Sequence, residues 1–328
     1  QRKKVYTDEV PAVSKMTSYL AAILVCLNII SPAAAQNADD NRERVNQGTV
    51  MVMGGGLTGT NAALVWDMAS LFDNGYELRV VPMLGRGSLR TSEDILYLKG
   101  VDVGFVQADV LDFLTEHNIY PNIRDVLRYI TVLFQEDFHV VARPGIETIQ
   151  DLQGKKVAFG PSTSGTFMSS SVIFERLGIV VEALDLPFDQ GLQQLRDGKI
   201  DAITRIAGAP ARYLTEVSKD EALHLLEVPA VGSPYKDATL TSDQYPGLIP
   251  LGDEVKSISV SSVMAAYNWP QDSPRRKKVQ RLVDTLFARL GELRVPPYHP
   301  KWKQVDLDLD LDGWQRWDQI PVPGEPQS

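Results

Sequence analysis

Two segments of the chain share one form, an apolar run followed by a loop of glycine and hydroxyl residues and then an amphipathic helical pattern. The first segment has its loop at 54–60, between a strand-like run at 49–53 and a helical pattern at 61–72, and the second repeats this order around the loop 160–166. A helix begins with unpartnered backbone N–H groups and partial positive charge, so such a junction can bind a carboxylate or phosphate. Two facing junctions predict a cleft with two helix N-termini directed into it. The alternative at each junction is an ordinary Ser/Thr N-cap.

The rest of the chain fits two α/β halves. In each half a glycine ends a helix and an aspartate precedes an apolar strand, at Gly100 and Asp102 in the first half and at Gly198 and Asp201 in the second. The length of 328 residues predicts about two domains.

Three apolar runs predict the strands that connect the halves. The runs 129–135 and 137–143 predict two strands that enter the second half, and 255–266 predicts a strand that returns to the first. The segment 232–252 is rich in Pro, Gly, Ser and Tyr and predicts loops. The predicted halves are lobe 1, residues 36–135 plus 256–328, and lobe 2, residues 136–255.

The first 35 residues have the composition of a secretory signal peptide. Basic residues within 1–15 precede an apolar run at 19–30 and a small-residue Ala-x-Ala site at 33–35. The apolar run is shorter than the about 20 residues that a membrane-spanning helix needs. We therefore predict a signal peptide at 1–35 and a periplasmic protein, with Met16 as an alternative start and an uncleaved anchor as the alternative role. The polar segment 36–47 predicts a frayed lead-in.

Composition and charge argue against several partners. The formal net charge of −9 argues against nucleic acid and anionic membrane surfaces. The one cysteine, Cys26, lies in the predicted signal peptide, so no disulfide is expected. The four histidines lack the spacing of metal ligands. We expect a monomer without a metal or a cofactor.

The sequence does not predict an enzyme. It contains neither a Gly-x-Ser-x-Gly elbow nor a His-Glu-x-x-His motif. The run 308–313 matches the opening of a calcium loop, but Gln319 stands where a bidentate glutamate should be. The glycines of 54–59 match a dinucleotide-binding loop, yet the next strand closes at 80–82 without an acidic residue for the ribose. A dinucleotide-binding oxidoreductase is the alternative that this loop leaves open.

Four motifs together resemble the TAXI-type substrate-binding proteins of TRAP transporters, over about residues 48–305. In order they are Gly100-x-Asp102-x-Gly104-Phe105-Val106-Gln107-x-Asp109, Asp151-Leu152-x-Gly154-Lys155-Lys156-Val157, Gly160-Pro161-x-x-Ser164-Gly165-Thr166 and Gly208-x-Pro210. The resemblance implies a periplasmic-binding-protein fold of the second type, with two α/β lobes joined by a two-stranded hinge. It also implies that a small organic solute, an amino acid or dicarboxylate, is delivered to a TRAP-type membrane permease without catalysis. An exported ligand-sensing protein of the same fold that feeds a sensor kinase is the alternative.

The predicted ligand-binding residues come from both junctions and from loops and strand ends that should face the cleft. They are Thr58, Gly59, Thr60, Asn61, Arg86, Ser88, Gln107, Asp109, Ser162, Ser164, Gly165, Thr166 and Arg205.

Several of these residues have a second interpretation. Gln107 and Asp109 either orient a polar ligand group or cap the following helix. Arg205 either binds a carboxylate through both nitrogens or forms a surface ion pair with Glu175 or Asp201. Phe138 either lines the cleft or belongs to the core.

Three positions depart from the pattern that the resemblance implies. Asn61 follows the first junction where an aromatic residue is usual, and Arg86 and Arg205 add positive charge. These differences favour a more acidic solute.

Overall fold

The computed structural model describes residues 32–57, 59–75 and 77–317, which belong to two units, Gln1–Gln47 and Gly48–Ser328. In the first unit, helix α2 spans Pro32–Gln47. The prediction of a frayed lead-in over 36–47 is therefore wrong, since a polar segment can still be helical and half of its residues are alanine, glutamine, glutamate or arginine, which have good helix propensity. Residues 1–31 of the predicted signal peptide and the predicted site residue Thr58 lie outside the described residues.

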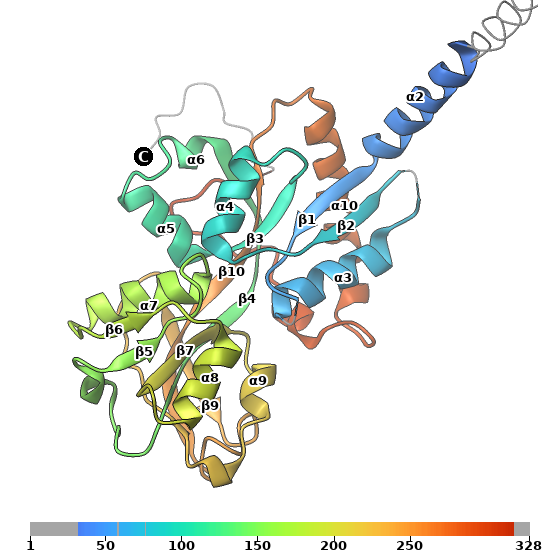
Figure 1. Cartoon of the computed structure of the whole chain (residues 1–328). Coiled ribbons are helices and arrows are strands. Elements are labelled where there is room, and N and C mark those ends of the chain that lie inside the picture. The colour runs from blue at the N-terminus through green and yellow to red at the C-terminus, as the bar shows by residue number, and fades with distance from the viewer. Residues whose placement is uncertain (1–31, 58, 76, 318–328) are drawn as a thin grey trace, which may run out of the picture. The chain divides into compact units, whose positions relative to one another are not determined.

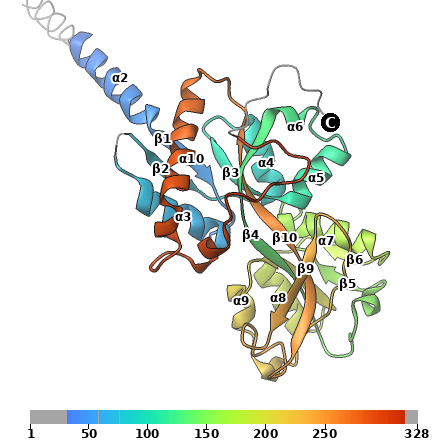
Figure 2. The same ribbon diagram turned by 180° about the vertical axis from the view of Figure 1, so that it is seen from behind.

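The second unit is built on one mixed sheet with the strand order β2-β1-β3-β10-β4-β7-β5-β6, to which β8 adds beside β4 and β9 beside β10. The strands are β1 (Thr49–Met53), β2 (Arg79–Met83), β3 (Val103–Gln107), β4 (Leu127–Ala142), β5 (Lys156–Ala158), β6 (Glu182–Leu184), β7 (Ala202–Ala207), β8 (His224–Leu225), β9 (Lys236–Thr241) and β10 (Glu254–Tyr267). The strands β1, β2 and β3 are parallel to one another, as are β5, β6 and β7. Between these groups, β10 and β4 pair antiparallel to each other and to their neighbours β3 and β7. Two long central strands thus belong to both halves of the sheet (Figures 1 and 2).

Helices cover the parallel strands of each half. In the first half these are α3 (Thr60–Phe72), α4 (Ser88–Tyr97), α5 (Ala108–Glu116), α6 (Ile123–Val126) and α10 (Pro274–Leu293). In the second half they are α7 (Gly165–Arg176), α8 (Phe188–Arg196) and α9 (Arg212–Thr215), with short 3-10 turns at Ile149–Leu152 and Lys219–Glu221 and, in the C-terminal segment, at Pro300–Gln304. The apolar residues of α3 and α10 share one core cluster with β1, whereas α5 and α7 share another cluster that continues from the first half into the second.

The strand β4 differs from its prediction in a way that matters for function. The sequence indicates two strands at 129–135 and 137–143, but the structure contains one strand of 16 residues, Leu127–Ala142. Glu136 and Asp137 interrupt the apolar pattern without interrupting the strand, because the ladders with β10 and β7 satisfy the backbone on both sides. Phe138 is buried in the core, 1% exposed, as its second interpretation proposed.

The predicted loop segment 232–252 also contains a strand. Residues Lys236–Thr241 form β9, which pairs antiparallel with β10. The Pro, Gly and Tyr residues around β9 hid a six-residue strand whose ladder is formed with β10, the next strand along the chain. None of the helices within 32–57, 59–75 and 77–317 has the length and apolarity that crossing a membrane requires.

Candidate functional site between two helix N-termini

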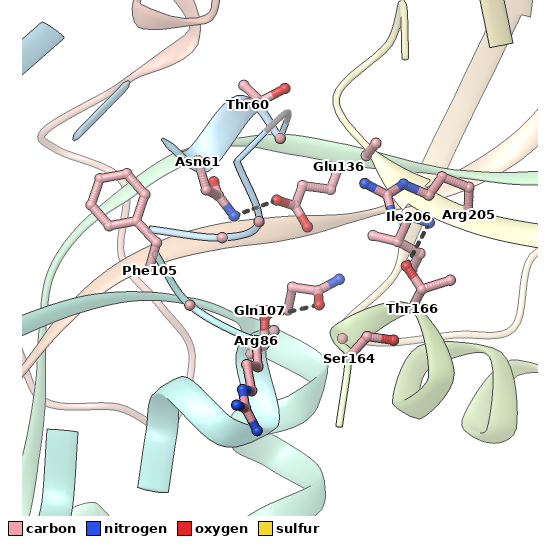
Figure 3. A pocket seen from close by; sticks show the side chains of 18 of the residues that line it. Thr60, Asn61, Arg86, Phe105, Gln107, Glu136, Ser164, Thr166, Arg205 and Ile206 are labelled. Carbon is pink, nitrogen blue, oxygen red and sulfur yellow. Dashed lines mark hydrogen bonds between the residues drawn. The ribbon is translucent and has the colours of Figure 1, made fainter. Parts of the chain in front are cut away.

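Both glycine–hydroxyl junctions open onto one cavity of about 440 Å³ (Figure 3). One wall contains the N-terminus of α3 and the other contains the N-terminus of α7. Predicted site residues that line this cavity are Gly59, Thr60, Asn61, Arg86, Ser88, Gln107, Ser164, Gly165, Thr166 and Arg205. The sheet topology explains the convergence. The carboxyl end of β3 pairs with the middle of β10 at Ser262, and the carboxyl end of β7 pairs with the middle of β4 at Asp137, so both halves direct their strand ends toward the same region.

Two predicted residues lie elsewhere. Ser162 is exposed and does not line the cavity. Asp109, at the start of α5, is 4% exposed and accepts hydrogen bonds from the hydroxyl groups of Ser169 and Tyr235, the latter at 2.8 Å. Its carboxylate therefore joins α5 to α7 and to the Tyr235 loop instead of facing the cavity, and burial raises its pKa. Asp109 is the second residue after the end of β3, so its direction is set by the first turn of α5, which the strand pattern alone does not show.

The two helix starts use their side chains differently. The Ser164 hydroxyl accepts a hydrogen bond from the backbone N–H of Phe167 at 3.1 Å, so it is an N-cap of α7 as the alternative interpretation held. Thr166 Oγ1 accepts from the backbone N–H of Ile206 at 3.2 Å, which ties α7 to β7. Among the described residues no side chain caps α3, whose N-cap is Gly59. Thr60 and Asn61, in the first turn of α3, both line the cavity.

The described structure adds one acidic group that sequence reasoning missed. Glu136 of β4 lines the cavity and is 6% exposed. Its Oε1 accepts a hydrogen bond from Asn61 Nδ2 at 2.9 Å, and Asn61 Oδ1 accepts from the Ser262 hydroxyl at 3.1 Å. Burial raises the pKa of Glu136 to about 7, although the Asn61 hydrogen bond and the positive charge of Arg205 act in the opposite direction. The sequence signal that could have indicated this site residue is the charged Glu136 within an otherwise apolar strand pattern.

Arg205 of β7 extends toward Glu136 across the cavity (Figure 3). Neither predicted surface pair forms, since Asp201 pairs with Arg143 at 2.6 Å and Glu175 lines a different cavity beside α5. Within the described part of the chain, no carboxylate lies within 4.0 Å of the Arg205 guanidinium. Burial lowers the pKa of Arg205 and the charge of Glu136 counteracts this. The arginine is thus a cation at the cavity wall that a ligand carboxylate can reach.

Gln107, at the end of β3, also lines the cavity and has a side-chain donor without a hydrogen-bond partner among the described residues. The Ser88 hydroxyl donates to Gln107 Oε1 at 2.9 Å, while Gln107 Nε2 is buried and has no hydrogen-bond partner among the described residues. A buried donor without a partner costs about 1–3 kcal/mol, so such groups commonly meet a ligand or water. Arg86 is exposed, and its side chain points away from Arg205 in Figure 3.

The two halves touch where they close around the cavity, and glycine makes this contact possible. Gly87, with φ of +116°, lies so close to the α7 loop that a Cβ atom would stand 2.5 Å from Ser164 Cα. A Cβ atom at Gly165 would overlap the side-chain amide of Gln107. Any side chain at these positions would force the two loops apart.

Two α/β halves that share two central strands, with a cavity between opposed helix N-termini, define a periplasmic-binding-protein fold of the second type. The fold class expected from the sequence is therefore confirmed. The chain belongs to the NMT1-like family, whose sequence profile matches residues 94–293.

The chain is also similar, at low sequence identity, to solved structures of several binding proteins. The periplasmic binding protein BugD is 15% identical, with 78% of this chain and 86% of that chain covered and a TM-score of 0.49. The amino acid ABC transporter substrate-binding protein AbpA from Streptococcus pneumoniae, bound to L-arginine, is 15% identical, with 80% and 98% covered and a TM-score of 0.44. The alkanesulfonate-binding protein SsuA from Xanthomonas axonopodis pv. citri, bound to MOPS, is 13% identical, with 79% and 86% covered and a TM-score of 0.45.

Proposed function

We propose that this protein is an exported receptor that closes two lobes on a small organic anion and delivers it to a TRAP-type membrane permease. In this proposal residues 1–35 are removed on export to the periplasm, and the lobes are 36–135 plus 256–328 and 136–255. The observation that carries the proposal is the convergence of the α3 and α7 N-termini and Arg205 on one cavity. Three sources of positive potential around a partly enclosed space favour a carboxylate.

The cavity also sets a condition on the anion. Glu136 lies opposite Arg205, so the bound solute must either offer a hydrogen-bond donor to that carboxyl group or bind while it is protonated. A hydroxy acid, an amino acid or a monoprotonated diacid meets this condition. Each good hydrogen bond to a carboxylate contributes roughly 1.5–3 kcal/mol, so a few of them suffice for micromolar binding after ordering costs.

Binding should close the lobes and require no chemistry. In the described residues, no three His, Cys, Asp or Glu side chains are arranged to hold a metal ion. The glycine loop after β1 contributes Gly55, Gly56 and Gly59 to the cavity wall. A solute receptor therefore accounts for these glycines as well as a dinucleotide-binding loop does. Ligand contacts from both halves would favour the closed arrangement, as population shift requires.

The experiment is a thermal-shift screen of hydroxy acids, amino acids and dicarboxylates on the protein from residue 36 onward, followed by calorimetry on each hit. We expect an acid that raises the melting temperature, and at least a tenfold weaker affinity in Arg205→Gln. Arg90→Ala, which removes an exposed arginine of α4 outside the cavity, is the matched control and should bind as wild type does. If every acid leaves the melting temperature unchanged, or if Arg205→Gln binds with wild-type affinity, the proposal fails.

A further inference from the structure

A second cavity of about 420 Å³ adjoins the first at the mouth between the two halves. Both cavities are lined by the same five residues at their common border, which are Gly59, Thr60, Arg205, Ala207 and Gly208. We call the cavity between the helix N-termini the inner chamber and this one the outer chamber. Because five residues line both, the two chambers are neighbours, and a molecule long enough to pass this border would contact the walls of both.

The chemistry of the outer chamber differs from that of the inner chamber. The first half contributes Leu57, which is 71% exposed, and Trp66 of α3, which is 56% exposed. The second half contributes Phe188 and Tyr213, whose ring centroids are 5.7 Å apart. The two walls differ in exposure, since Leu57 and Trp66 are exposed, whereas Phe188 and Tyr213 are half-buried and Phe188 also packs against a core cluster of the second half. Exposed apolar surface that is gathered around a hollow indicates an apolar occupant.

Arg205 marks the border between the two kinds of surface. Its guanidinium carbon lies 5.4 Å from the centroid of the Phe188 ring, so one face of the guanidinium packs on an aromatic wall of the outer chamber. Its donors remain directed to the inner chamber, where Glu136 lies. This arrangement suits a molecule whose acidic group meets the guanidinium and whose apolar part continues past Phe188.

We propose that the solute is a two-part molecule, with an acidic head in the inner chamber and an aromatic or similarly bulky apolar tail in the outer chamber. This inference rests on the proposed receptor function and names the class of its solute. Burial of one phenyl group from water corresponds to about a ten- to hundredfold gain in affinity.

The test compares two acids with the same head, butyrate and 4-phenylbutyrate, by isothermal titration calorimetry at pH 6, where Glu136, with a pKa of about 7, is mostly protonated and does not repel a plain carboxylate. The variants are Trp66→Ala and Tyr213→Ala, which remove the apolar walls, and Tyr97→Ala, which removes an exposed ring of α4 outside both chambers. We expect 4-phenylbutyrate to bind at least tenfold tighter than butyrate in wild type and in Tyr97→Ala. In Trp66→Ala and Tyr213→Ala we expect this ratio to fall below about threefold while butyrate affinity stays unchanged.

Several outcomes overturn the inference, and they are separable from failure of the receptor proposal. Equal affinities of the two acids in wild type, or an unchanged ratio in both wall variants, show that the outer chamber does not hold the tail. If neither acid binds while a short hydroxy acid or dicarboxylate does, the receptor proposal stands and this inference falls. If no acid of any kind binds, both fall.

Discussion

Replacement of Glu136 by glutamine should make the protein more stable at pH 8. The side chain lies in β4, is 6% exposed and accepts a hydrogen bond from Asn61, which glutamine can still accept. Burial raises the pKa of this carboxyl group from 4.5 to about 7. The folded protein therefore holds a proton that the unfolded chain has already lost between these two pH values, and stability falls as the pH rises through this window.

The magnitude follows from the size of the shift. A rise in the pKa from 4.5 to about 7 corresponds to roughly 3–4 kcal/mol of unfolding free energy. Most of this loss falls between pH 5 and pH 8. Glutamine has no proton to lose, so the Glu136→Gln variant should gain about that much stability relative to wild type as the pH is raised.

Urea unfolding followed by tryptophan fluorescence at pH 5, 6, 7 and 8 measures this difference directly. Glu182→Gln, which changes an exposed glutamate of β6, is the matched control and should follow the wild-type pH dependence. If Glu136 were instead ionised and stabilised by Arg205, Glu136→Gln would lose stability at pH 8. That result, or identical pH dependence in Glu136→Gln and wild type, would refute the assignment of a protonated carboxyl group to the cavity.

Three further predictions test other parts of the structure. Affinity of wild type for a plain carboxylate should be higher at pH 6 than at pH 8, because the pKa of Glu136 lies near 7 and its ionised form repels an anion. In Glu136→Gln the affinity measured by calorimetry should be the same at both pH values. If the affinity of Glu136→Gln falls with pH as much as that of wild type, the prediction is wrong. Gly165→Ala should hold the halves apart and lower solute affinity at least tenfold, whereas Gly291→Ala, at an open position of α10, should bind normally; wild-type affinity in Gly165→Ala would show that closure does not need this contact. Lys278→Met should lower the unfolding free energy by about 3–5 kcal/mol, since it leaves the fully buried Asp102 without its cation at 2.6 Å; a loss below about 1 kcal/mol in urea unfolding would be inconsistent with an essential pair.

The predictions that succeeded from sequence rest on short-range pattern. The two strand–loop–helix junctions were visible because glycines, hydroxyl residues and a change of apolar period mark a strand end and a helix start within about ten residues. The same pattern indicated the α/β class and the long strand β10, which spans Glu254–Tyr267 against a predicted 255–266. The TAXI-type assignment, the permease and the ligand roles of the site residues stay predictions.

The two errors in predicted strands share one physical cause, which is that pairing with other strands overrides local composition, whereas the placement of Asp109 was missed because of helix geometry. β9 was predicted as loop because its strand character comes from β10 and not from its own sequence. β4 was divided at Glu136 because a charged residue ends an apolar run in sequence, although the ladder continues through it. Asp109 was assigned to the cleft because it follows a strand end, although the first turn of α5 directs it to Ser169 and Tyr235.

The sequence by itself thus determined that the chain has two junctions able to start helices with open N–H groups, because that property depends on residues within one turn of each other. Only the tertiary structure decided that both junctions face the same cavity and that Glu136 and Arg205 both line it. It also decided that Asp109 does not line this cavity. Those outcomes depend on how β4 and β10 bring distant segments together. The pKa of the Glu136 carboxyl group is raised by its burial in that fold and lowered by Asn61 and Arg205, which lie far from it in the chain.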